Sequence, residues 1–152
     1  MKDHNVIKKI FILAWAYCVE IVAAAMVVVC LNVLVGTKAV YRCLVESSTE
    51  VTAILAGMLA IVVGTAAAAA GYLRSISNND MPNGTTVHNV YRAAFTYAVI
   101  VEVVAMCAAF IARFDLRMIG TQAVAVLIVY ALINVITSVR NVFDIARLSP
   151  AE

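Results

Sequence analysis

Four long apolar runs, separated by polar segments, dominate the pattern of the sequence. They cover residues 10–35, 51–73, 93–112 and 118–139. A helix needs about 20 mostly apolar residues to cross the hydrocarbon core of a bilayer, and each run reaches that length. The pattern therefore predicts an all-α integral membrane protein. We expect a single domain, residues 1–152, made of four transmembrane helices in an up-down bundle.

The segments around these runs predict where the helices begin and end. Residues 74–90 are rich in Ser, Asn, Gly and Thr and predict a polar loop. Residues 140–149 predict a helical extension of the last span. Ser47 and Glu50 have the spacing of a capping box, which predicts a helix that begins just before the second run.

Basic residues are concentrated on one side of the predicted bundle. Seven of the 11 Lys and Arg residues belong to the side that holds the termini and the 74–90 loop: Lys2, Lys8, Lys9, Arg74, Arg92, Arg140 and Arg147. Cytoplasmic loops carry an excess of Lys and Arg. This distribution predicts that both termini and the 140–149 extension are cytoplasmic. We expect a multi-pass protein of a bacterial or archaeal inner (plasma) membrane.

The composition supports a membrane protein and argues against a nucleic-acid partner. Hydrophobic residues make up 64% of the chain and charged residues 13%, against roughly 45–50% and about 25% in soluble domains. So few polar residues cannot cover a water-exposed surface. The net charge of +2 does not indicate a nucleic-acid-binding surface. The partner that the composition predicts is the lipid bilayer.

The residues that most often carry enzyme chemistry are sparse. The four cysteines are Cys18, Cys30, Cys43 and Cys107. Three lie in apolar runs and none forms a CxxC pair, so we expect small buried side chains rather than disulfides or a zinc site. The two histidines, His4 and His88, lie in polar segments. The sequence therefore predicts a protein that is not an enzyme, with no catalytic residues, no metal and no cofactor.

Two glutamates, Glu20 and Glu102, lie in the middle of the first and third apolar runs. An acid at mid-membrane costs about 2.5–3.5 kcal/mol on insertion scales, so such a residue is a functional candidate. In an up-down bundle these two helices run in the same direction, which puts both acids roughly 15 Å deep. If they face each other, the pair would hold a proton or a cation. The alternative is that each glutamate is protonated and bonds a neighbouring helix as a structural contact.

Other polar residues are expected near this level. Tyr130 and Thr65 have a similar predicted depth and complete the candidate layer for ion or proton binding. Tyr17 and Tyr97 lie about one turn from the two acids, and a buried tyrosine hydroxyl requires a partner that a carboxylate can provide. Thr137, with Asn134, lies nearer the predicted cytoplasmic face, where it would line an entrance.

Small residues recur along the second run with alternating spacings of four and three. They are Ala53, Gly57, Ala60, Gly64, Ala67 and Gly71, called the α-stripe below. Small side chains permit close approach of helix backbones in lipid. Because glycine weakens a helix, its repeated use predicts a helix-packing face. The neighbour is either another helix of the same chain or another subunit.

These features lead to two hypotheses of function. The first is a small oligomeric channel or transporter-like protein whose mid-membrane carboxylate layer binds a proton or a cation. The alternative is a non-catalytic structural or assembly subunit of a larger membrane complex. The expected protein partners are further copies of the chain in the first case and other membrane subunits in the second.

Overall fold

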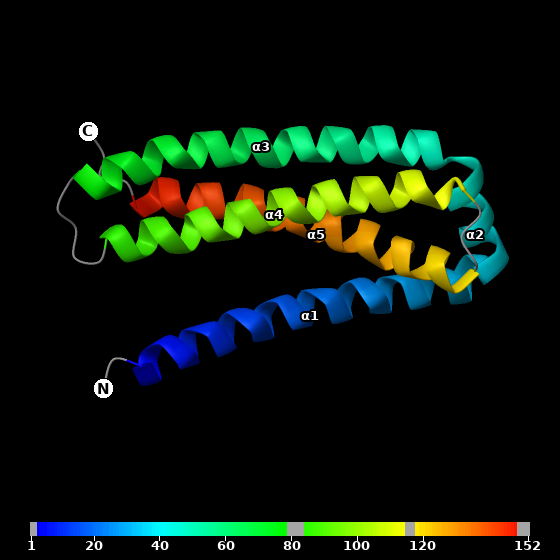
Figure 1. Cartoon of the computed structure of the whole chain (residues 1–152), viewed down its shortest axis with the longest axis horizontal. Coiled ribbons are helices and arrows are strands. Elements are labelled where there is room, and N and C mark those ends of the chain that lie inside the picture. The colour runs from blue at the N-terminus through cyan, green and yellow to red at the C-terminus, as the bar shows by residue number, and fades with distance from the viewer. Residues whose placement is uncertain (1–2, 79–83, 115–117, 149–152) are drawn as a thin grey trace.

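The part of the chain that the computed structural model describes is entirely helical apart from short connections (Figure 1). The described residues are 3–78, 84–114 and 118–148, with side chains for 17–74, 88–114 and 119–147. The helices are α1 (Asp3–Val35), α2 (Thr37–Glu46), α3 (Ser48–Asn78), α4 (Gly84–Ala112) and α5 (Met118–Leu148).

Four of these helices, α1, α3, α4 and α5, are long and apolar enough to cross a membrane. Their outward faces carry large apolar side chains: Val33, Leu34 and Ile119 are 79%, 81% and 85% exposed. Contact with water would be unfavourable for so many apolar groups, whereas lipid tails accommodate them. The prediction of an all-α membrane protein with four candidate spans is therefore confirmed.

The tightest packing involves α3, α4 and α5. A stripe on α4 is buried and repeats every three or four residues: Phe95, Ala98, Glu102, Ala105, Ala109 and Ala112. The alanines let α4 approach α3 and α5 closely. On α3 the buried side chains include Leu55, Val62 and Ala69, which are seven residues apart. These three helices form the core of the bundle.

Helix α1 is the least enclosed of the long helices. It contacts α5 and α2, and toward its N-terminal end it diverges from the rest of the bundle (Figure 1). Ala24 and Val28 are its buried apolar residues among the side chains described. The first residues of α1 and the last residues of α5 lie at the same end of the bundle (Figure 1).

A short helix, α2, was not predicted. Gly36 separates it from α1 and has φ +93°, a conformation that side chains other than glycine rarely adopt. The Gly36 N–H still donates to the Asn32 carbonyl at 3.0 Å, and the Gly36 carbonyl accepts from the Ala39 N–H at 3.0 Å. The chain therefore changes direction within a single residue while its backbone groups remain bonded.

Helix α2 lies across the end of the bundle opposite the start of α1 (Figure 1). Leu44 is buried and packs in one cluster with Val28 of α1 and Ala125 of α5. Lys38 and Arg42 are exposed. One apolar face against the bundle and one charged face outward are typical of a helix at the membrane surface.

Helical structure continues into the segment that was predicted as a polar loop. Helix α3 extends to Asn78 and α4 begins at Gly84, so both enter the 74–90 range, and residues 79–83 lie outside the described part. The predicted start of the second span agrees with the structure, because α3 begins at Ser48 and the Ser47 carbonyl accepts from the Val51 N–H at 2.9 Å. Helix α5 continues without a break to Leu148, within the predicted 140–149 extension.

The expectation that the cysteines are buried was wrong. Cys18, Cys30, Cys43 and Cys107 are all free and exposed. Apolar runs in a membrane helix have outward faces as well as inward ones, so an apolar neighbourhood in the sequence does not imply burial inside the protein. The thiols lie on the outer surface of the bundle.

Candidate functional site

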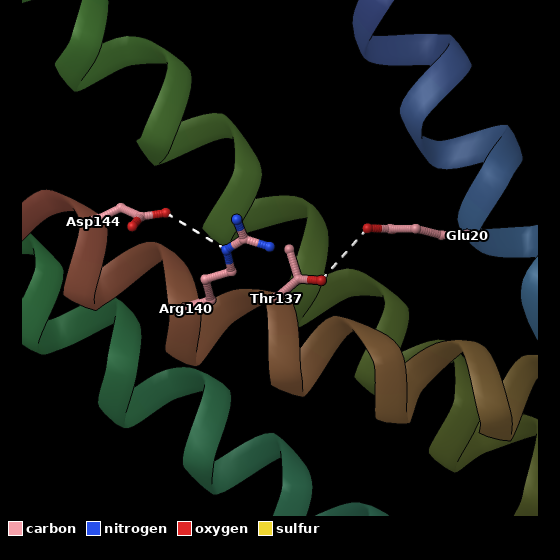
Figure 2. Close-up of polar contacts among 4 residues, drawn as sticks. All are labelled: Glu20, Thr137, Arg140 and Asp144. Atoms are coloured by element: carbon pink, nitrogen blue, oxygen red, sulfur yellow. Dashed lines mark hydrogen bonds and ion pairs between the residues drawn. The ribbon is translucent and has the colours of Figure 1, made fainter.

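Glu20 is partly buried and extends from α1 toward α5 (Figure 2). Its Oε1 accepts a hydrogen bond from Thr137 Oγ1 at 3.4 Å. Arg140, three residues further along α5, pairs with Asp144 at 3.9 Å instead (Figure 2). That ion pair is solvated, with side chains 82% and 42% exposed. Among the described residues, Thr137 is therefore the hydrogen-bond partner of the Glu20 carboxylate.

Three tyrosines join α1, α4 and α5 beside Glu20. The hydroxyls of Tyr97 on α4 and Tyr130 on α5 are 2.8 Å apart and share a hydrogen bond. The ring of Tyr17 on α1 packs on Tyr97 with centroids 4.4 Å apart. Tyr17 precedes Glu20 by three residues, so both lie on one face of α1. We call Tyr17, Glu20, Tyr97, Tyr130 and Thr137 the α1 polar cluster.

A mainly apolar cavity of about 390 Å³ lies next to the α1 polar cluster. Its walls come from α1, α4 and α5, and they include Ile21, Tyr97, Leu127 and Tyr130. Tyr97 and Tyr130 therefore belong both to the cavity wall and to the α1 polar cluster. This arrangement places polar groups at the edge of an apolar space between α1 and the three-helix core.

Glu102 has a different environment. Its side chain is completely buried, and neither carboxylate oxygen has a hydrogen-bond partner among the described residues. One neighbouring layer of the core contains Ala98 and Val135, and another contains Ala105 and Ala131. Glu102 thus lies in the α3–α4–α5 core, between residues of two hydrophobic clusters. A buried polar group without a partner costs about 1–3 kcal/mol.

The two glutamates do not form a hydrogen-bonded pair. Because Ala98 packs in one cluster with Val135, Glu102 lies near the level of Ala131. Glu20 contacts Thr137, about six residues or about 9 Å further along α5. Tyr97 marks the side of α4 that meets α1, because its ring packs on Tyr17. Glu102 follows Tyr97 by five residues and therefore points about 140° away from that side. The structure therefore shows two separate acidic positions rather than one facing pair.

The remaining predicted members of the layer are Tyr130 and Thr65, and neither bonds Glu102. Tyr130 belongs to the α1 polar cluster. Thr65 donates from Oγ1 to the Val62 carbonyl at 2.8 Å, within its own helix, so its described bond is to the backbone and not to a carboxylate. Tyr97 bonds the Tyr130 hydroxyl, where a carboxylate partner had been expected. Spacing along one helix indicates the depth of a side chain but not the neighbour that it meets.

A second polar contact between α1 and α5 lies toward the α2 end of the bundle. Asn32 Nδ2 donates to Gln122 Oε1 at 2.7 Å. The other amide atoms of this pair, and the Thr121 hydroxyl, are buried without a partner among the described residues. Helix α1 is therefore attached to α5 by polar contacts at two levels.

The α-stripe faces outward. All six residues are exposed, and a Cβ added at Gly57, Gly64 or Gly71 would meet nothing within 4 Å. Each of these glycines follows a buried residue of α3 by two positions, which is about 200° around the helix. Among the described residues, no side chain of another helix therefore packs against these glycines. The alanines of α4, in contrast, pack inside the chain.

The described residues hold no group of three His, Cys, Asp or Glu side chains that could bind a metal ion. Compared with protein-family models, with curated proteins and with solved structures, the chain gives no match. A functional conclusion for this chain therefore depends on the arrangement of its own residues.

Proposed function

We propose that the chain is a small membrane channel or transporter-like protein in which intramembrane carboxylates bind a proton or a cation. The observation that carries this proposal is Glu102, an acid that is completely buried and whose oxygens have no partner among the described residues. An acid in lipid is costly, and acids that occur there mark ion or proton pathways. A bound proton would neutralise this carboxylate, and a bound cation would supply its missing partner.

The structural-contact hypothesis fits Glu102 poorly. A glutamate that holds helices together should hydrogen-bond across their interface, and the oxygens of Glu102 bond no described residue. Glu20 fits that hypothesis better, because it bonds Thr137 across the α1–α5 interface. The two acids therefore have different proposed roles. Glu102 is the central binding group, and Glu20 is the acid of the more open α1 face.

The α1 polar cluster supports the second proposed role, that of Glu20 as an acid on a more open face. Helix α1 contacts the core through α5, and the cavity of about 390 Å³ lies between α1, α4 and α5. Rocking of α1 against α5 would change the exposure of Glu20 and of the tyrosine pair. On the distribution of Lys and Arg, we further propose cytoplasmic termini and an inner-membrane location.

The test is flux in proteoliposomes that enclose a pH-sensitive dye, driven by a potassium diffusion potential, with sodium or potassium outside. Glu102→Gln keeps the size of the side chain and removes its charge. We expect it to lower flux at least about tenfold, which corresponds to about 1.4 kcal/mol in the barrier. Glu46→Gln, an exposed acid on α2, is the matched control. Wild-type flux in a Glu20→Gln, Glu102→Gln double variant would overturn the proposal.

A second candidate, a structural or assembly subunit, is favoured by the outward α-stripe. Its six small residues leave open space on α3 where a helix of another subunit would pack closely. Gly64→Leu should then release that subunit during purification in mild detergent. Val63→Leu, exposed beside the stripe, should not. Retention of the same assembly by Gly64→Leu would count against a subunit contact at this face.

A further inference from the structure

A cavity of about 450 Å³ lies between α3 and α4, and neither Glu20 nor Glu102 belongs to its described lining. Its walls are mainly apolar and include Ala70, Leu73, Phe95 and Val99. The same cavity is bordered by three side chains that are or can become cationic, Arg74, His88 and Arg92. A basic rim above an apolar wall is the combination that an anionic amphiphile requires.

The position of this cavity in the bundle adds to the argument. Arg74 directly follows the apolar run that ends at residue 73, and Arg92 directly precedes the run that begins at residue 93, so the rim lies at the membrane boundary that the sequence predicts. Arg92 is one helical turn from His88. Phosphate groups of lipids occupy this boundary, while the apolar wall continues toward the hydrocarbon. The exposed side chain of Ile100, 54% accessible, extends the wall on the outer surface.

The charge of the rim is not balanced by an acid that the structure describes. No carboxylate of a described residue lines the cavity. The ion pair between described residues is Arg140–Asp144, on α5, so no described acid pairs with Arg74 or Arg92. Both arginines are exposed. A guanidinium presents a planar set of donors that matches the oxygens of a phosphate.

We propose that this cavity binds an anionic phospholipid, with its phosphate between Arg74 and Arg92 and one acyl chain along Phe95 and Val99. Basic pockets between transmembrane helices bind anionic lipid headgroups. The apolar wall favours a lipid over a free phosphate, because burial of an acyl chain adds about 0.8 kcal/mol per CH₂ group. This site is independent of the proposed carboxylate function, and either conclusion can fail without the other.

The first test uses purified full-length protein and native mass spectrometry after addition of phosphatidylglycerol or phosphatidylcholine. Wild type should retain phosphatidylglycerol preferentially. Arg74→Gln with Arg92→Gln should weaken its binding about tenfold or more. The matched control is Lys38→Gln with Arg42→Gln, which removes the same charge at the opposite end of the bundle (Figure 1). Equal retention of both lipids by wild type, or equal loss in both double variants, would overturn the proposal.

The second test addresses the acyl chain and does not alter charge. Ala70→Phe should fill the cavity and reduce phosphatidylglycerol binding, while Ala68→Phe, exposed on α3 outside the cavity, should not. Circular dichroism and a monodisperse elution profile check that each variant is folded. Inorganic phosphate and glycerol phosphate serve as competitors without an acyl chain. Unchanged binding in Ala70→Phe, or displacement of the lipid by these competitors at equal concentration, would show that no acyl-chain site exists here.

Discussion

Replacing Glu102 with methionine should make the protein more stable. Glu102 is completely buried, and its oxygens have no described partner. A neutral carboxyl in this state costs about 1–3 kcal/mol, and an ionised acid at mid-span about 2.5–3.5 kcal/mol. Methionine is unbranched and adapts to irregular space, so it should fit between the neighbouring alanine layers. We expect a gain of about 1–3 kcal/mol in the free energy of unfolding.

The assay is reversible unfolding in mixed micelles by titration with sodium dodecyl sulfate, followed by circular dichroism. Glu102→Gln keeps a polar head group without a partner and should change the free energy of unfolding by less than about 1 kcal/mol. Glu46→Gln should remain within about 0.5 kcal/mol of wild type, as exposed substitutions usually do. Destabilisation of Glu102→Met by more than about 1 kcal/mol would refute the reasoning, because the carboxylate would then have a stabilising partner.

Two further predictions concern the backbone at Gly36 and the tyrosine pair. Gly36→Ala should lower the free energy of unfolding by roughly 1–3 kcal/mol, because alanine is strained at φ +93°. Wild-type stability of this variant in the same titration would show that residue 36 does not hold this positive φ in the folded protein. Tyr97→Phe should cost about 0.5–1.5 kcal/mol by removing the 2.8 Å hydroxyl contact with Tyr130. Adding Tyr130→Phe should then cost little more, and fully additive losses in this double-mutant cycle would contradict a direct bond.

The spans could be predicted from the sequence because membrane insertion depends on length and apolarity, which a local window measures. Helix α2 was missed because its ten residues are too few for a membrane span and include three charged side chains. The signal that could have revealed it is the four-residue spacing of Lys38, Arg42 and Glu46, which places three charges on one helical face. Gly36 before that series marks the break.

The direction in which each face points could not be predicted in the same way. The α-stripe and the alanine stripe of α4 have the same spacing, yet the first is exposed and the second is buried. In lipid, a stripe of small residues can pack equally well against a helix of the same chain or of another subunit. The spacing alone therefore does not tell which way the stripe points. The same limit applies to Glu20 and Glu102, whose depths were inferred from helix position. Their neighbours depend on how α1 and α4 are rotated against α5.

The central claim is that the Glu102 carboxylate binds a proton or a cation, and infrared difference spectroscopy tests it most directly. The protein would be reconstituted in bilayers, and spectra recorded before and after a change of pH or of sodium concentration. The account predicts a carboxyl difference band that is present in wild type and in Glu46→Gln and absent in Glu102→Gln. Identical difference spectra for wild type and Glu102→Gln would contradict it.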